Sequence, residues 1–471
     1  MRPHIPLKTA LGTWCGLLFA LSVQGAGAAE WPLQASPVQG PRLLCHMRLA
    51  DQQAQLIALP QADPYAPTRQ TFEGRFSLSA VVLIDHISLT VHDLSQGGSP
   101  VVAHQMLLDR PFAQASEPGA ASLTGWQHVY SGTLEREFVY GCALQGDVAA
   151  ASAASPVRSP ASSPLPSRAD VLPGPTVRMA WLGDIMLADG PGRWVRRGGN
   201  PFAPTARSLA QADVRVANLE CVVATSGKAI DKPWTFKAHP RVLPLLKQHV
   251  DVVSLANNHS GDFGPGAFAE MLQRLDGVGL PYFGGGRSLR EAHQPRIIER
   301  KGLKIALLGY DEMFPRRFEA GPDVPGVAWS EDAQVAFDIR EARKQADIVI
   351  PFMHWGQEHE PKAHARQRQL ARLMIDAGAD AVVGTHPHVV QDVERYRGKP
   401  IVYSLGNFVF DGFSSIDNNT GWILWLDVNR RGVQQWRVEE VRQDRNGTPH
   451  PIKRPTLQPL MPESLGGTGA H

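Results

Sequence analysis

The sequence lacks the features that mark several protein classes. It has 4 cysteines in 471 residues and no CxxC pair, which excludes a disulfide-rich scaffold and a thiolate zinc finger. The 47 Lys and Arg residues nearly balance 45 Asp and Glu residues, so the charge predicts no nucleic-acid partner. The hydrophobic fraction is 43%, which is typical of a globular chain and excludes a disordered or multi-span membrane protein.

The N-terminal 29 residues have the pattern of a secretory signal peptide. Arg2 and Lys8 precede an apolar run over about residues 10–23, and small residues follow at 25–29. This order predicts cleavage at the end of the small-residue stretch. The alternative is an uncleaved anchor, although the run is short for a membrane span of about 20 residues. We therefore predict a protein exported to the periplasm or beyond, with no transmembrane span after cleavage.

Export permits disulfide bonds in the mature chain. Cys45 and Cys142 lie near the two ends of one predicted domain, and we predict that they pair. Cys221 then remains as a free, buried thiol that packs like a small hydrophobic residue.

Changes in composition divide the rest of the chain into four segments. Residues 30–148 carry short apolar and alternating runs, which predict a small β-rich domain. Residues 149–175 are mostly Ala, Ser and Pro and predict a flexible linker, because such a segment buries too little surface to offset its ordering entropy. Residues 176–445 form a larger domain, and residues 446–471 are predicted to be a disordered tail.

In the larger domain, short apolar runs alternate with amphipathic stretches. The runs are 177–182, 214–217, 252–255, 305–308, 348–352, 381–383 and 401–405. Residues 265–276, 331–346 and 364–377 have apolar residues at helical spacing. This alternation predicts an α/β domain with a largely buried sheet. Residues 422–428 and 433–438 predict an antiparallel hairpin that completes a sheet.

Polar side chains follow five of these runs. They are Asp184 after the first run, Glu220 after the second, Asn258 and His259 after the third, His354 after the fifth, and His386 and His388 after the sixth. Because the carboxyl ends of strands form the ligand-binding edge of α/β sheets, we expect these groups to converge. Each one alone has a simpler explanation, as a helix N-cap or as part of a turn. Their repetition at one edge favours a site.

The types of these side chains indicate a divalent metal. Imidazole nitrogens mixed with carboxylate and amide oxygens, without a thiolate, suit Zn, Mn or Fe. There are enough donors for one or two ions. Two ions about 3.5–4 Å apart clamp a phosphoryl group and lower the pKa of a bound water toward about 7. The sequence therefore predicts a metal-dependent phosphoesterase.

Six sequence blocks of this domain resemble a known family. They are GDIML, ANLE, SLANNHSGDFG, HWGQEH, GTHPHVVQ and YSLGNFVFD, within about residues 176–430. They are similar to those of the CapA, or poly-γ-glutamate capsule biosynthesis, family of the calcineurin-like metallophosphoesterases. The resemblance implies a four-layer αββα sandwich. It also implies a role in capsule or cell-envelope polymer synthesis, with an anionic polymer or phosphoester as substrate and the capsule synthesis or export machinery as a possible partner.

The resemblance also implies a role for each matching residue. The implied ligands are Asp184 and His388 for a first metal, His354 and His386 for a second, Glu220 as the bridge and Asn258 as an amide ligand. His259 takes the place of the histidine that protonates the leaving oxygen or stabilises the transition state. A general acid of this kind typically contributes 10²–10⁴-fold to the rate.

One position departs from the pattern of the superfamily. Its first block is Asp-x-His, whereas here Met186 follows Asp184, and a thioether is a weak ligand for a hard divalent ion. The first metal site is therefore one imidazole short, and the binding of a second ion stays open. We expect Asp262, Glu358 and His359 to support the ligands or the fold rather than to bind metal.

Two basic residues are candidates for binding an anionic substrate. Lys237 and Arg287 could neutralise phosphate or carboxylate groups, and the alternative is that both are ordinary surface charges. A second function is also open, in which the same fold serves as a non-catalytic accessory or scaffold for making or exporting a capsule polymer. The retained metal donors favour the hydrolase.

Overall fold

A computed structural model describes most of the two predicted domains. The described residues are 42–49, 52–61, 63–72, 74–83, 86–94, 99–107, 123–124, 127–131, 136–145, 172–313, 316 and 318–452. The predicted signal peptide, residues 149–171 of the linker and residues 453–471 of the tail lie outside this set. No described helix combines the length and the hydrophobicity that crossing a membrane requires.

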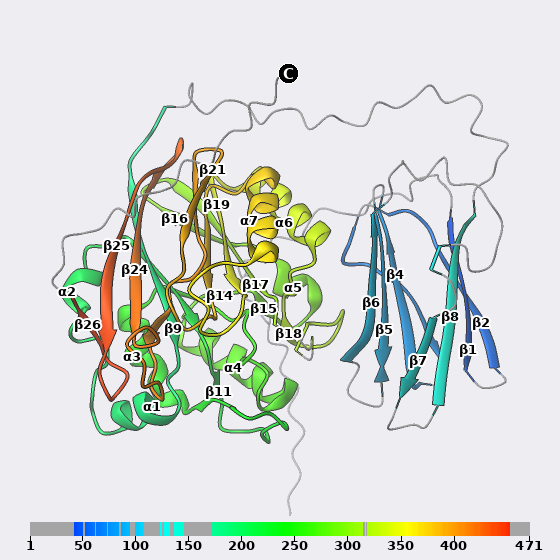
Figure 1. The fold of residues 1–471 in the computed structure, drawn as a ribbon, viewed down its shortest axis with the longest axis horizontal. Helices are drawn as coiled ribbons and strands as arrows, with labels where there is room; N and C mark the ends of the chain where they lie inside the picture. The colour runs from blue at the N-terminus through cyan, green and yellow to red at the C-terminus, as the bar shows by residue number, and fades with distance from the viewer. Residues whose placement is uncertain are drawn as a thin grey trace, which may run out of the picture. The chain divides into compact units, whose positions relative to one another are not determined.

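The N-terminal part consists of two antiparallel four-stranded sheets (Figure 1, blue to cyan). The strands are β1 (Arg42–Leu49), β2 (Gln52–Ala58), β3 (Thr68–Phe72), β4 (Phe76–Val82), β5 (His86–Asp93), β6 (Ser99–Leu107), β7 (Gln127–Ser131) and β8 (Arg136–Gln145). The sheet orders are β2-β1-β8-β7 and β3-β4-β5-β6. Side chains of both sheets, such as Met47 and Leu78, share one hydrophobic cluster. The predicted β-rich domain is therefore confirmed.

A disulfide joins the two central strands of the first of these sheets. Cys45 on β1 and Cys142 on β8 are bonded across 97 residues of chain. The two residues are direct partners in the strand register, and both are fully buried. Cys221, in the other domain, is a free and buried cysteine.

Replacing both Cys45 and Cys142 with Ala is expected to lower the free energy of unfolding of the β-rich domain by about 4–5 kcal/mol. The reason is that a cross-link across roughly 100 residues restricts the unfolded chain. Denaturant unfolding of the full chain under oxidising conditions measures the change. Cys221→Ala is the control, since it removes a buried sulfur without removing a cross-link. Equal transitions for the double variant and its parent would contradict this expectation.

The C-terminal part contains two mixed sheets. One has the order β14-β13-β10-β9-β24-β25-β26, with β23 also paired to β9, and the other has the order β16-β17-β19-β20-β22-β21. Strands of the first sheet are β9 (Val177–Ile185), β10 (Val214–Leu219), β13 (Val252–Ser254), β14 (Tyr282–Phe283), β23 (Asn407–Val409), β24 (Thr420–Asn429), β25 (Gly432–Gln443) and β26 (Pro449–Pro451). Strands of the second are β16 (Arg296–Arg300), β17 (Leu303–Asp311), β19 (Ile348–His354), β20 (Val382–Thr385), β21 (Val393–Tyr396) and β22 (Lys399–Val402). Two small pairs are β11 (Val222–Val223) with β12 (Lys237–Ala238) and β15 (Gly285–Gly286) with β18 (Gly326–Val327).

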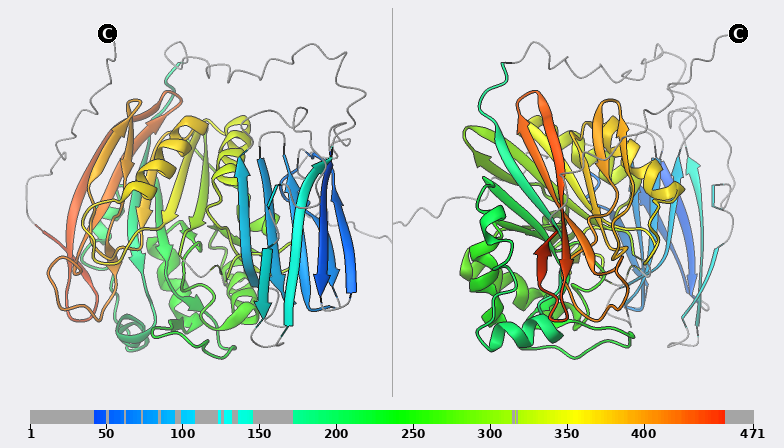
Figure 2. Two further views of the ribbon diagram at one scale, coloured as in Figure 1. Left: turned by 45° about the vertical axis from the view of Figure 1, so that its right-hand side comes forward. Right: turned by 60° about the vertical axis from the view of Figure 1, so that its left-hand side comes forward.

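Helices cover the outer faces of both sheets (Figures 1 and 2). Those of the eight-stranded sheet include α3 (Leu243–His249) and α4 (Gly264–Val278), and those of the six-stranded sheet include α6 (Asp332–Gln345) and α7 (Ala365–Ala377). The shorter helices are α1 (Asp189–Arg196), α2 (Ala206–Leu209), η4 (Pro240–Val242) and α5 (Leu289–His293).

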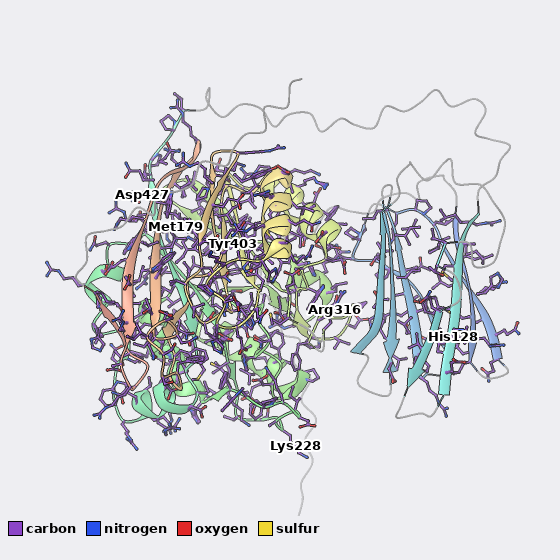
Figure 3. The ribbon with its side chains drawn as sticks, in the orientation of Figure 1. His128, Met179, Lys228, Arg316, Tyr403 and Asp427 are labelled. Carbon is purple, nitrogen blue, oxygen red and sulfur yellow. A yellow bond between two sulfur atoms is a disulfide. The ribbon has the colours of Figure 1, made fainter. Side chains whose placement is uncertain are left out.

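The inner faces of the two sheets pack directly on each other. Their shared hydrophobic cluster includes Trp181 and Phe352, whose ring centroids are 5.3 Å apart. Figure 3 shows Met179, another member of this cluster, inside the domain and Lys228 in an exposed loop. The layers are therefore helix, sheet, sheet and helix, and the predicted αββα sandwich is confirmed.

The predicted elements lie where the hydrophobic periodicity placed them. Each of the seven apolar runs contains residues of a strand, and each of the three amphipathic stretches forms a helix. The hairpin is β24 with β25, which pair antiparallel, and β24 adds to the sheet beside β9. Helix α4 ends at Val278 and is capped by Gly279, whose φ of 64° is the left-handed conformation typical of a helix C-terminus.

The ordered chain continues past residue 445, where we expected a disordered tail to begin. Strand β26 pairs antiparallel with β25 and adds an edge to the sheet. The turn before it forms because Asp444 Oδ1 accepts hydrogen bonds from the backbone N–H groups of Asn446 and Thr448. The prediction of disorder was thus wrong for residues 446–452, since it relied on composition and overlooked this turn.

Candidate metal centre

Strands of the two sheets have their carboxyl ends at one edge of the sandwich. Asp184 lies at the end of β9 and Glu220 directly follows β10. From the other sheet, His354 ends β19, and its Nε2 lies 3.0 Å from Oδ1 of Asn258, which follows β13. His386 follows β20, and its backbone N–H donates to Asp184 Oδ2 at 3.3 Å. Groups about 200 residues apart in sequence are therefore side by side, as we expected of these strand ends.

Glu220 lies at the centre of this cluster. Its Oε1 is 3.5 Å from Nε2 of His354, 3.8 Å from Nε2 of His388 and 4.0 Å from Nε2 of His259. The side chain is fully buried, and neither carboxylate oxygen has a hydrogen-bond partner among the described residues. Burying a carboxylate without a partner is costly, by several kcal/mol. The arrangement therefore fits a bound cation.

Three donor atoms lie around Nε2 of His354 and form a group of four with it. Its Nε2 is 3.5 Å from Glu220 Oε1, 3.0 Å from Asn258 Oδ1 and 3.2 Å from His386 Nδ1. Ligands about 2.1 Å from a tetrahedral ion lie about 3.4 Å from one another. The spacing of these two imidazoles, one carboxylate and one amide thus matches the ligand shell of a single divalent ion.

A second group of donors consists of Asp184, Glu220 and His388. His388 Nδ1 donates to Asn407 Oδ1 at 2.8 Å, because the amide nitrogen of Asn407 is already used in a bond to the Asn418 carbonyl. This hydrogen bond leaves His388 Nε2 as the nitrogen that can bind a metal. A hydrogen bond also orients Asp184, since its Oδ1 accepts from the side-chain amide of Asn218 at 2.8 Å.

The turn after β20 holds two of the histidines in a strained backbone. His386 has a φ of 96° and His388 a φ of 55°. Residues other than glycine rarely adopt this backbone conformation. Just before them, a Cβ on Gly384 would lie 2.2 Å from the Tyr403 carbonyl oxygen, so glycine is required there. Strain of this kind, at about 1–3 kcal/mol per residue, persists where surrounding structure holds it in place, often at a functional site.

Burial shifts the pKa values of the candidate carboxyl and imidazole ligands in the direction that favours their neutral forms. For Glu220, burial and the nearby charge of Asp184 raise the pKa well above its usual value. Burial also raises the pKa of Asp184 to about 6. Burial and neighbouring imidazoles lower the pKa values of His354 and His386, and burial lowers the pKa of His388 to about 4. The imidazoles are therefore in the neutral form that binds metal, whereas the carboxyl groups must lose protons first.

Met186 does not join the cluster of donors. It is buried in the hydrophobic cluster on the helix-covered face of the eight-stranded sheet. Among the residues that the structure describes, the group that contains His388 consists of three protein donors.

His259 is held with one face of its ring against Phe236, at a centroid distance of 4.3 Å. Its Nδ1 lies 2.6 Å from Oδ2 of the fully buried Asp262. Lys232 Nζ donates to Asp262 Oδ1 at 3.0 Å and to the Asn258 carbonyl at 2.8 Å. These contacts direct His259 Nε2 toward Glu220, whose Oε1 is 4.0 Å away. Asp262 thus supports a predicted site residue, as we expected.

Some residues of this edge were missed by the sequence analysis. Asp311 ends β17, is the register partner of His354 and is buried, which raises its pKa to about 8. It follows the fourth apolar run, so the strand-end argument would have found it had it been applied to that run. Asn407 lies inside a motif block, but only the tertiary structure shows that it orients a ligand. For Lys232 the sequence holds no comparable signal.

The two predicted substrate cations contact other groups. Lys237 Nζ donates to two backbone carbonyls of the loop before it and lies 4.2 Å from the centroid of Phe263. Arg287 forms ion pairs with Asp276 at 2.6 Å and Glu291 at 2.7 Å. Their role in substrate binding stays a prediction.

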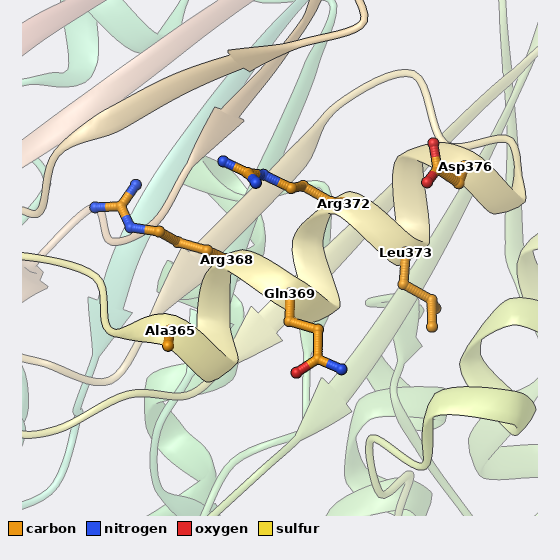
Figure 4. A pocket seen from close by; sticks show the side chains of 6 residues that line it. All are labelled: Ala365, Arg368, Gln369, Arg372, Leu373 and Asp376. Carbon is orange, nitrogen blue, oxygen red and sulfur yellow. The ribbon is translucent and has the colours of Figure 1, made fainter. Parts of the chain in front are cut away.

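A pocket on the outer face of α7 is separate from the donor cluster. It is lined by Ala365, Arg368, Gln369, Arg372, Leu373 and Asp376 (Figure 4). Arg368 and Arg372 form ion pairs with Asp392 and Glu394, which are outside the donor groups. The pocket therefore offers none of the metal-binding donors described above.

The fold and the site define a class of protein, an αββα sandwich with a buried cluster of imidazole, carboxylate and amide donors at one edge of its two sheets. Residues 178–412 match the family described as "Bacterial capsule synthesis protein PGA_cap". The chain belongs to this family.

Two relatives illustrate the similarity. The "PGA biosynthesis protein CapA" of Bacillus subtilis (strain 168) is 33% identical over 290 residues, which is 59% of this chain and 74% of the relative. The "Capsule biosynthesis protein CapA" of Bacillus anthracis is 32% identical over 244 residues, which is 50% of this chain and 59% of the relative. The chain therefore spans less than two thirds of the second relative.

A distant similarity to solved structures also exists. A 5'-nucleotidase precursor from Thermus thermophilus has a TM-score of 0.37 and 14% sequence identity, over 58% of this chain and 56% of that protein.

Proposed function

We propose that this protein is an exported, metal-dependent phosphoester hydrolase that acts in the synthesis of a capsule or envelope polymer of the poly-γ-glutamate type. The observation that carries the catalytic part is Glu220, a fully buried carboxylate with no hydrogen-bond partner among the described residues and three imidazoles within 4.0 Å. Family membership supports the polymer, and the pattern of residues 1–29 supports export.

The donor set fits one or two divalent ions. His354, His386 and Asn258 would hold one ion, Asp184 and His388 the other, with Glu220 between them. When bound, such ions supply a water of lowered pKa and neutralise charge on a phosphoryl group.

The chain's own acid is His259. Burial lowers the pKa of His259, whereas the bond from its Nδ1 to Asp262 stabilises the imidazolium and holds the ring in place, so that Nε2 can donate a proton to the leaving oxygen. Phe236, packed on the ring and largely buried, excludes water from that side.

The competing accessory function has a physical objection. A protein that only binds other proteins gains nothing from a buried, unpaired carboxylate, since its burial lowers stability. Packing alone gives no reason for imidazole and carboxylate donors to gather at the same point, whereas a metal ion satisfies all of them at once.

The test is metal content and turnover of the full chain. We expect the purified protein to hold one or two divalent ions tightly, measured by elemental analysis after dialysis against Mn²⁺ and then buffer. We also expect metal-dependent hydrolysis of p-nitrophenyl phosphate or its diester. A folded protein with less than about one ion and no turnover after addition of Mn²⁺, Zn²⁺ or Fe²⁺ would favour the accessory function instead.

Metal binding is expected to release protons and to weaken below about pH 6. Asp184, with its pKa raised to about 6, is protonated below that pH, and the pKa of Glu220 is also raised, so protons compete with the ion for both carboxylates. His388 does not limit binding in this range, because its pKa is lowered to about 4.

Calorimetric titration with Mn²⁺ in buffers of different ionisation enthalpy measures the released protons. We expect more protons per ion at pH 5.5 than at pH 7.5, and an affinity that falls up to about tenfold per pH unit below pH 6 for each competing carboxyl. An affinity that does not change between these pH values would contradict the assignment of both carboxylates.

A further inference from the structure

Three groups of donor side chains interlock at this edge of the sandwich. They are Asp184 with Glu220 and His388, Glu220 with His354 and His386, and Glu358 with His386 and His388. Within each group the ligand atoms all lie within 4.8 Å of one another. Each pair of groups shares one residue, so the groups form a closed cluster. In the third group, Glu358 is the residue to which no ligand role has been assigned above.

The turn that carries Glu358 is bonded to the turn that carries the two histidines. Beyond β19 the chain reverses, with a φ of 94° at Gly356 and of 68° at His359. The backbone N–H of His359 donates at 2.8 Å to the carbonyl of Pro387, which lies between His386 and His388 in the chain. Asn418 Nδ2 donates to His359 Nδ1 at 2.8 Å. These bonds place the backbone of Glu358 beside both imidazoles.

The Glu358 carboxylate occupies the solvent side of the cluster. Its side chain is 53% exposed, whereas His386 and His388 are buried. Within the part of the chain that the structure describes, the buried Nε2 of His386 has no hydrogen-bond partner. A neutral imidazole has one nitrogen with a free lone pair, and its other nitrogen carries a proton, so His386 can bind a cation through one nitrogen only.

We propose that Glu358 is a ligand of the divalent ion at His388, binding from the solvent side, where it lies beside His386 and His388. This inference rests on the proposed metal centre and revises our expectation that Glu358 only supports the ligands or the fold. Because His388 Nδ1 donates to Asn407, its remaining nitrogen serves a single ion. Glu220 Oε1 lies 3.8 Å from that nitrogen on the buried side, and Glu358 adds a carboxylate from the open side.

The assignment accounts for the donor count at His388. The buried side supplies three protein donors, and the side chain of Met186 is packed in the core. Oxygen donors are the ones that Mn²⁺ prefers, and an additional carboxylate favours a doubly charged ion by its charge as well as by its lone pairs. Glu358 therefore raises the affinity of the ion.

The test is Co²⁺ binding by the full chain and its Glu358→Gln variant, with Co²⁺ alone as the probe. The visible absorption of Co²⁺ reports the number and geometry of its ligands, and competition with a chelator gives the affinity. The matched control is Glu360→Gln, which removes an exposed carboxylate two residues further on. We expect Glu358→Gln to bind one ion about 10–100-fold more weakly and to change the Co²⁺ spectrum. We expect Glu360→Gln to match the parent in both.

Thermal unfolding without metal shows whether both variants keep the parent's stability, as an exposed position predicts. If Glu358→Gln binds Co²⁺ with the affinity and spectrum of Glu360→Gln, the role of Glu358 as a ligand is overturned, while the proposed function stands. If the parent itself binds no Co²⁺, both the proposed function and this inference fail. The two failures are therefore distinguishable.

Discussion

Glu220→Gln is expected to abolish tight metal binding and to leave the metal-free protein at least as stable as its parent. Glu220 belongs to the donor group of His354 and to that of His388. Its loss therefore affects every ion that these two groups hold. In the parent, the carboxyl group is fully buried, and neither of its oxygens has a hydrogen-bond partner among the residues described. An amide of the same shape cannot ionise, so at neutral pH the variant avoids the cost of a buried group without a partner, which is about 1–3 kcal/mol.

The gain in stability should depend on pH with a defined sign. The pKa of Glu220 in the metal-free fold is raised, first by burial and then by Asp184, so folding favours the protonated form. The parent therefore loses stability as the pH rises above the pKa of an unfolded glutamate, until the buried group itself ionises. Gln has no charge to bury, and we expect the variant's advantage to grow from pH 4 to pH 8.

Glu394→Gln is the matched control, because Glu394 is also a buried carboxylate but has partners. It accepts hydrogen bonds from Arg372 Nε and Tyr403 Oη, both at 2.8 Å. Removing its charge should destabilise the fold and spare metal binding. Metal content by elemental analysis and thermal unfolding with and without Mn²⁺ measure both properties. A Glu220→Gln protein that retains the parent's ions would remove Glu220 from the metal centre.

His259→Ala is expected to reduce turnover by about 10²–10⁴-fold while the bound metal remains. The ring is not a member of any donor group, and its Nε2 lies 4.0 Å from Glu220 Oε1. Its contacts are those of a proton donor, with Asp262 at Nδ1 and Phe236 against its face.

The leaving group distinguishes a proton donor from a structural residue. A nitrophenolate leaves readily without a proton, whereas an alkoxide needs one, so the loss should be larger for an alkyl phosphate than for p-nitrophenyl phosphate. The control is His249→Ala. This variant removes the imidazole at the end of α3, which stacks on the ring of Phe202. Equal losses on both substrates would show that His259 is not the general acid.

Most of the secondary structure followed from local patterns. The run 348–352 became β19, and the stretch 364–377 became α7, whose start is fixed by a capping box between His364 and Gln367. Hydrophobic periodicity predicts such elements because burial of one face decides them. The β26 strand was missed, since the Asp444 turn that creates it has no hydrophobic signal.

The candidate ligands were predictable for a related reason. Asp184 and His354 lie at the ends of buried strands, and parallel strands bring the residues at their carboxyl ends to one edge of the sheet. The same argument did not reach Asn407 or Lys232. Asn407 contacts His388, and Lys232 contacts Asp262 in the turn that carries His259. No spacing in the sequence encodes these contacts.

The order of strands and helices and the chemical types of donor at the strand ends can be derived from the amino-acid sequence alone, because both depend on neighbouring residues. Four other features emerge only from the packed domain: Glu220 has no hydrogen-bond partner among the described residues, Nδ1 of His388 donates to Asn407, Met186 packs in the core, and Glu358 lies beside two histidines. These outcomes depend on how two sheets align and pack across about 200 residues of chain, and packing over such separations is set by the whole domain.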